Sequence, residues 1–168
     1  KVPKESTGNG PRAPPSRYRG KMISLSGLLT AVAAKLSAIS AVTTLAPTIT
    51  AYIDSVPTNN SLGQAVYQMT TGEVLIAWTS TNIADDGYQW RHNISIFAKA
   101  AESQSSLALL NAIVDGKATG DGNIPWRLAE LLPGLTVGDV DEINRITDSQ
   151  SIDHFEIKVS LLEIGDTF

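Results

Sequence analysis

The sequence predicts an α+β fold, in which one mixed, mostly antiparallel β-sheet is flanked by two helices. Two segments repeat their apolar residues at helical spacing, and several others are short apolar or alternating runs that are typical of strands. Their order is helix, strand, hairpin, helix and second hairpin, and hairpins pair neighbouring strands antiparallel. The length of 168 residues indicates one folded domain, over residues 22–168, preceded by an arm.

The first helix is expected from Ser26 to Ile39, with Ser26 as its N-cap. A short strand at 49–53 follows Pro47, which suits the edge of a sheet. The strand at 73–79 is nearly all apolar, so both of its faces should be covered. The apolar residues of the helix recur at i, i+3 and i+4: Leu28, Leu29, Val32, Leu36 and Ile39.

A hairpin should join the strand at 73–79 to one at 88–98, through a turn that contains Asp86-Gly87. The second of these strands alternates, so Trp90, His92, Ile94 and Ile96 should share one face and Arg91, Asn93 and Ser95 the other. We interpret the region from Trp78 to Trp90 as core and not as an active site.

The second half of the domain predicts a helix at 105–115, a helical turn at 128–132, and strands at 140–147 and 155–161. The last strand has one apolar face, and its other face should meet water or a partner. Its apolar residues Phe155, Ile157, Val159 and Leu161 alternate with His154, Glu156, Lys158 and Ser160.

Charge is distributed unevenly along the chain. Residues 1–21 hold six basic residues and one acidic residue, a net charge of +5, whereas the remainder holds seven basic and sixteen acidic residues, a net charge of −9. The arm is rich in proline and glycine and has too few apolar side chains to form a core. We therefore expect a flexible basic arm, which either docks on an acidic neighbour or contacts nucleic acid without sequence preference.

Little in the sequence indicates chemistry. There is no cysteine, which excludes thiol catalysis and thiolate metal sites. His92 lies on an apolar strand face and is interpreted as a core or interface imidazole, although a general base acting with Asp85 or Asp86 is the alternative. The acidic loop at 115–123 lacks the spacing of a calcium loop, and no apolar run is long enough to span a bilayer. We expect no enzyme activity, no cofactor, no metal site and no membrane partner.

Several stretches resemble the tail terminator and minor neck (head–tail joining) proteins of long-tailed bacteriophages. The resemblance covers the layout of residues 22–166, while the basic arm has no counterpart in it. The stretches that carry it are Gln68–Thr79, Gly87–Phe97, the helix at Ser105–Gly116, Pro125-Trp126-Arg127 and Asp153–Val159.

The resemblance implies a structural virion protein with no catalytic residues, assembled as a six-fold ring. Such a ring sits at the head-proximal end of the tail tube, ends its polymerisation and joins it to the head connector, close to packaged DNA; the chain would be assembled in the host cytoplasm. A head–tail stopper or adaptor, a tail tube protein and, more remotely, a nucleic-acid-binding module acting through the arm are the alternatives. The residues that the sequence pattern suggests for partner binding are Arg12, Arg17, Arg19, Lys21, Arg91, Trp126, Arg127, His154 and Lys158.

Overall fold

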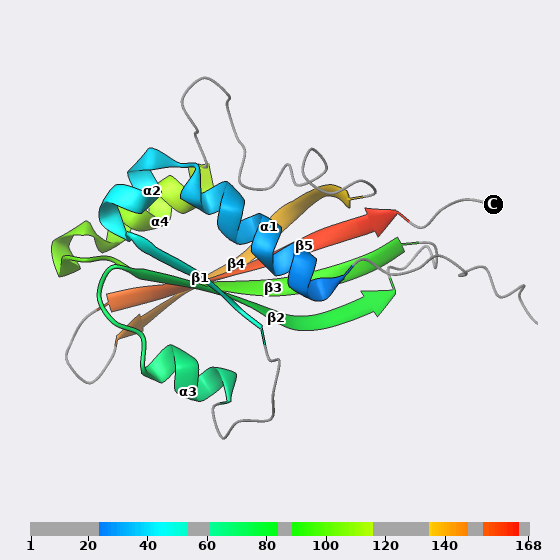
Figure 1. Cartoon of the computed structure of the whole chain (residues 1–168), viewed down its shortest axis with the longest axis horizontal. Coiled ribbons are helices and arrows are strands. Elements are labelled where there is room, and N and C mark those ends of the chain that lie inside the picture. Colours follow the sequence, from blue (N-terminus) through cyan, green and yellow to red (C-terminus); the bar gives the residue numbers. More distant parts are fainter. Residues whose placement is uncertain (1–23, 54–60, 84–88, 116–134, 148–152, 165–168) are drawn as a thin grey trace, which may run out of the picture.

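A computed structural model of the chain describes residues 24–53, 61–83, 89–115, 135–147 and 153–164 (Figure 1). Within these ranges the order of helices and strands is that of an α+β fold. The elements are α1 (Leu25–Ser37), α2 (Ser40–Leu45), β1 (Thr48–Tyr52), α3 (Leu62–Tyr67), β2 (Glu73–Ile83), β3 (Gln89–Lys99), a 3₁₀ turn (Ser103–Ser105), α4 (Ser106–Asp115), β4 (Leu135–Thr147) and β5 (Asp153–Ile164).

The five strands form one mixed sheet in the order β1-β2-β3-β5-β4, which confirms the predicted fold class. β1 pairs with β2 in parallel, and every other pairing is antiparallel. Both expected hairpins, β2–β3 and β4–β5, are therefore adjacent pairs in the sheet. The edge strands of the sheet are the short β1 and the long β4. Because β1 ends at Tyr52, β2 has no paired residue in β1 beyond Ala77.

Three helices, α1, α2 and α4, cover one face of the sheet, which we call the helical face (Figure 1). Side chains from α1 and α4 pack on apolar side chains of β2, β3 and β5 because strand alternation directs these toward the helices. The five apolar positions predicted for α1 are all buried, as expected. The strand residues of this core are Val74, Ile76, Ile94, Ile96, Ala98, Ile157, Val159 and Leu161.

The opposite side of the sheet, which we call the polar face, has a smaller core under α3 (Figure 1). Leu75, Ala77, Phe97 and Met69 are buried there against partly buried residues of α3 and β1. The β5 and β4 part of this face carries His154, Glu156, Lys158 and Ser160 on β5, in agreement with the predicted alternation.

The turn that leads into β2 depends on a glycine. Gly72 has a φ of +80°, a conformation that side chains other than glycine rarely adopt. Its N–H donates to the carbonyl of Lys99, and its own carbonyl accepts from the N–H of Thr48. Gly72 therefore connects the start of β1, the start of β2 and the end of β3 at one end of the sheet.

Several expectations need correction. The N-cap of α1 is Ser24 and not Ser26, because the hydroxyl of Ser24 accepts from the N–H of Gly27. The chain has two further short helices, α2 and α3, so the sheet is not flanked by two helices alone. β4 begins at Leu135, five residues before the predicted start.

Some expectations lie outside the described residues. They are the basic arm at 1–21, the turn around Asp85 and Asp86, the part of the 115–123 loop after Asp115, and the helical turn at 128–132.

Candidate functional site

Three of the residues predicted to bind partners lie on the polar face of the sheet. Arg91 is exposed on β3, and His154 and Lys158 are on β5. The structure thus brings them to one face, although Arg91 and His154 lie near opposite ends of it. The other six predicted residues lie outside the described ranges: Arg12, Arg17, Arg19, Lys21, Trp126 and Arg127.

Polar side chains of β3, β4 and β5 bind one another across the open part of this face. Lys158 Nζ donates to Glu142 Oε2 at 2.6 Å, which lowers the pKa of Glu142 and raises the pKa of Lys158. The hydroxyl of Ser95 donates to Glu156 at 2.9 Å, and the hydroxyl of Ser160 lies 3.2 Å from the carboxylate of Asp141. The face therefore carries one ion pair, Lys158 with Glu142, and two carboxylates that accept hydrogen bonds from serine hydroxyls.

A second ion pair lies near the β4–β5 turn. The guanidinium of Arg145 donates to Asp153, and the hydroxyl of Thr147 donates to the same carboxylate. These two hydrogen bonds, Arg145 first, lower the pKa of Asp153, and the carboxylate in turn raises the pKa of Arg145. One acid on each strand, Glu142 of β4 and Asp153 of β5, thus has its ionised form stabilised by a base on the other strand.

His92 lies on the helical face in a buried chain of hydrogen bonds, at the end of the sheet away from Gly72. Its Nε2 lies 2.6 Å from Glu163 Oε2, and its Nδ1 lies 3.0 Å from the Thr81 hydroxyl. The indole N–H of Trp78 donates to the same hydroxyl at 2.9 Å. The Thr81 hydroxyl thus bridges the indole of Trp78 and the imidazole of His92.

A β-bulge makes this arrangement possible. The register of β2 against β3 shifts between Trp78 and Ser80, so Thr79 is an extra residue. Without it, side chains three positions apart would point to opposite faces of the sheet, and Trp78 could not reach Thr81.

Glu163, the buried partner of His92, is the residue of this network that the sequence analysis did not identify. It continues the alternation of Phe155, Ile157, Val159 and Leu161 on the buried face, which is the signal that could have identified it. The acids considered earlier as partners of His92, Asp85 and Asp86, lie outside the described residues.

A Thr–His–Glu chain has the residue types of a nucleophile, a base and an orienting acid. Here, however, the imidazole is completely buried. The chain joins β2, β3 and β5, and its geometry fits a structural role for His92, as interpreted from the sequence.

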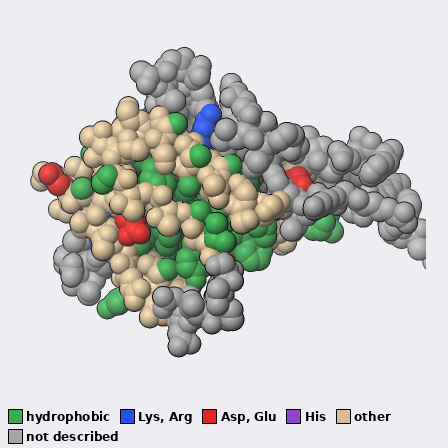
Figure 2. Space-filling view, in the orientation of Figure 1, with side chains coloured by type: hydrophobic (Ala, Val, Ile, Leu, Met, Phe, Trp, Pro, Cys, Tyr) green, Lys and Arg blue, Asp and Glu red, His purple; other side chains and the backbone are tan. Residues whose placement is uncertain are grey.

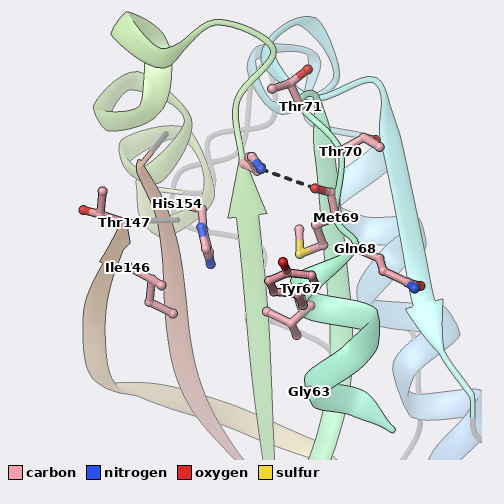
Figure 3. A pocket seen from close by; sticks show the side chains of 11 residues that line it. Gly63, Tyr67, Gln68, Met69, Thr70, Thr71, Ile146, Thr147 and His154 are labelled. Atoms are coloured by element: carbon pink, nitrogen blue, oxygen red, sulfur yellow. Dashed lines mark hydrogen bonds between the residues drawn. The ribbon is translucent and has the colours of Figure 1, made fainter. Parts of the chain in front are cut away.

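A groove of about 810 Å³ crosses the end of the polar face (Figure 3). One wall is α3 with the segment from Gln68 to Thr71, and the other is Ile146 and Thr147 of β4 with His154 of β5. Lys99 of β3 also lines it, and its ammonium donates to the carbonyl of Met69 at 3.3 Å. His154 was expected to be solvated or at an interface, yet only 7% of it is exposed, because it stands within this concave surface.

Exposed apolar side chains occur at both edges of the sheet. Trp78 is 42% exposed, which corrects its interpretation as a core residue, and Ile83 is exposed farther along β2. Ile53, which directly follows β1, is also exposed. At the other edge, Ile143 of β4 is exposed.

The surface in the view of Figure 2 is mostly uncharged where the structure describes it, with a few red and blue groups among green and tan ones. In the described ranges, no three His, Asp or Glu side chains are grouped as metal ligands would be. None of the described helices is both long and apolar enough to cross a bilayer. No model of a known protein family matches the chain, and no curated protein is significantly similar to it.

Proposed function

We propose that this protein is a structural ring subunit that resembles phage tail terminators. Its ring caps the head-proximal end of the tail tube, ends tube polymerisation and joins the tail to the head connector. The observation that carries the proposal is that the two opposite edges of the sheet expose different apolar side chains.

Two unlike edges suit head-to-tail assembly. Ile53, Trp78 and Ile83 follow the β1–β2 edge, whereas Ile143 lies on β4 at the far edge. A contact between the β1–β2 edge of one subunit and the β4 edge of the next is heterologous. Each subunit then uses both edges, and a suitable rotation between neighbours closes the ring. Removing such exposed apolar side chains from water at a subunit contact would stabilise the contact.

The edges also differ in their availability for pairing. Beyond Ala77, β2 has no β1 neighbour, and its next residues, from Trp78 to Ile83, carry no charge. β4 is irregular, with register shifts at Thr136/Asp139 and Val140/Glu142, and carries charged residues. Charges on β4 discourage uncontrolled strand addition, and bulges do so on both strands, since β2 also has one between Trp78 and Ser80. This asymmetry favours a defined contact over open-ended aggregation.

The polar face suits contacts with the tail tube or the head connector. Its paired charges and hydroxyls form the kind of hydrated, polar surface that occurs at the rims of protein interfaces. The buried His92 network gives no support to the enzyme alternative, since a catalytic base has to reach a substrate. A nucleic-acid module would need basic residues on the folded surface, and two of the described bases, Arg145 and Lys158, are occupied by acids.

Imaging of particles that contain the protein tests the proposal. Averaging the neck without imposed symmetry should show six copies between the tail tube and the head connector. Particles assembled without the protein should have tails of uncontrolled length that fail to join heads. Copies repeated along the tail would identify a tube protein, and a ring attached to the head alone would identify a stopper. A lone copy per particle would contradict every ring assignment.

A further inference from the structure

We infer that the basic arm, residues 1–21, docks on the polar face of the sheet, with its arginine and lysine side chains against Glu156 and Asp141. The arm comes from the same chain or from a neighbouring copy. This inference goes beyond the proposed function, because it concerns only the arm and this face and holds for a monomer and for a ring alike.

The docking surface is a second groove, of about 340 Å³, which crosses the polar face near the middle of β3 and β5. The residues that line it come from β2, β3, β4 and β5, and none comes from a described helix. The described helix on this side of the sheet, α3, packs instead near Leu75, Ala77 and Phe97. The polar residues that line the groove are Thr79, Asn93, Ser95, Asp141, Glu156 and Lys158.

Two carboxylates in this groove have room for further hydrogen bonds. Glu156 accepts from the hydroxyl of Ser95 at 2.9 Å, and Asp141 accepts from the hydroxyl of Ser160 at 3.2 Å. An ionised carboxylate has about four acceptor positions, so each of these groups can bind a charged donor in addition to its serine. Asp141 is exposed and Glu156 is partly exposed, which leaves both within reach of a partner.

The base that lines the groove does not neutralise these two acids. Lys158 donates to Glu142 at 2.6 Å, and Glu142 lies outside the groove. In the described ranges, neither Glu156 nor Asp141 forms an ion pair with a base. The three carboxylates and one ammonium give this part of the face a net charge of −2. The face therefore attracts a positively charged segment.

The arm has the complementary charge. Residues 1–21 carry a net charge of +5, whereas the rest of the chain carries −9. Arg17, Arg19 and Lys21 occupy every second position, so in an extended conformation their side chains share one face. The guanidinium of an arginine can also bind a carboxylate through two parallel N–H groups. The arm thus offers a row of cationic donors to a surface that has free acceptors.

The spacing of the charges agrees on the two sides. Asp141 binds Ser160, which lies four residues along β5 from Glu156. Arg17 and Lys21 are also four residues apart. Four residues of extended chain span roughly 13 Å. An arm that runs extended along β5 can therefore place one base at each carboxylate.

Disulfide cross-linking in the full chain tests this inference. The chain has no cysteine, so Ser16→Cys, next to Arg17, and Thr79→Cys, at an exposed position in the groove, provide its only thiols. The control combines Ser16→Cys with Thr44→Cys, which replaces an exposed threonine on α2. If Thr79→Cys does not fold, Asn93→Cys takes its place in the groove.

Under mild oxidation at 0.1 M salt, the groove pair should cross-link several fold faster than the control pair, as measured by mass spectrometry of the linked peptides. The difference should shrink at 1 M salt, where the attraction between charges is screened. A cross-linked monomer on a non-reducing gel identifies docking of the chain's own arm, and a cross-linked dimer identifies the arm of a neighbour; either supports the inference. Equal rates for the groove pair and the control pair would overturn it.

Charge variants of the groove pair separate docking from chance contact. Asp141→Asn and Glu156→Gln should each slow the cross-link about two- to fivefold, the effect of one exposed ion pair. Glu102→Gln neutralises an exposed acid outside the groove and should leave the rate unchanged. Arg17→Glu with Lys21→Glu should lower the rate to that of the control pair, and adding Asp141→Lys with Glu156→Lys should restore it. Unchanged rates in Asp141→Asn and Glu156→Gln, or no rescue by the reversed charges, would refute the inference.

Discussion

The two faces of the sheet differ in how many of their side chains are buried in an apolar core. The helical face packs eighteen buried residues into one continuous core with α1, α2 and α4. The polar face has four buried residues under α3, and its remaining width holds ion pairs, hydroxyls and a groove with two bases. The comparison teaches that most of the apolar core lies on one face of the sheet, and we propose that the sheet edges serve recognition.

The buried polar groups follow the same division. On the helical face, His92 and Glu163 bind each other and, through Thr81, reach Trp78. Their hydrogen bonds connect β2, β3 and β5 inside the fold. On the polar face, Lys99 and His154 are nearly buried but line a concave surface.

The largest difference between the faces should come from a core truncation. Ile157→Ala removes a fully buried side chain from the helical face and should lower the free energy of unfolding by about 2–5 kcal/mol. Lys158→Ala, one residue farther on the same strand, should melt like the wild type, because surface ion pairs contribute little. Urea unfolding followed by circular dichroism measures both. Similar losses in the two variants would remove the distinction between the faces.

The next effect should come from the His92 network. His92→Ala should cost about 1–3 kcal/mol, because it leaves the buried partner Glu163 without its imidazole. In the double variant with Glu163→Leu, the loss should be smaller than the sum of the two single losses. A double-mutant cycle from urea unfolding gives this coupling. Additive losses, or a substrate turned over by the wild type and not by His92→Ala, would overturn the structural interpretation.

A smaller effect should appear in acid. The pKa of Asp153 is lowered in the folded state, chiefly by its hydrogen bond from Arg145. Its stabilising contribution is thus complete above the usual value of 3.8 and is lost as the pH falls through the lowered folded value. In Asp153→Asn, the melting temperature should depend less on pH below about 4 than it does in the wild type. Curves that stay parallel over this range would contradict the linkage.

The smallest effect on the fold should follow deletion of residues 1–21. The described core begins at the Ser24 cap of α1, so the melting curve should barely change. Assembly should weaken, since the +5 arm is expected to dock on an acidic neighbour. The difference in assembly between the deletion variant and the wild type should be smaller at high salt, because the Debye length falls from ~10 Å at 0.1 M to ~3 Å at 1 M. Assembly unaffected at low salt would show that the arm is dispensable, and a lost fold would move the domain boundary.

Periodicity predicted the parts of the fold where burial is one-sided and continuous. The core positions of α1 and the alternation of β3 and β5 are visible in the sequence because each has a whole face against the core. α2 and α3 were missed because each has six residues and buries one apolar side chain or none. The early start of β4 was missed because its register shifts interrupt the alternation.

The candidate sites were harder to predict, because they depend on contacts between distant positions. His92 and Glu163 are 71 residues apart, and Lys99 joins His154 only through the pairing of β3 with β5. Trp78 reads as core from its apolar neighbours, and only the missing β1 neighbour beyond Ala77 leaves it exposed. Such outcomes follow from sheet order, which local sequence patterns do not encode.

The central claim, that the sheet edges join subunits into a ring, is tested most directly by native mass spectrometry at micromolar concentration. The wild type should give a closed assembly of six times the 17.9 kDa subunit mass. Ile83→Asp and Ile143→Asp, one on each edge, should give monomers with unchanged melting curves, whereas Leu107→Asp, at an exposed position on α4, should assemble normally. Edge variants that keep the wild-type mass, or a wild type that stays monomeric in solution and as a single copy in particles, would contradict the account.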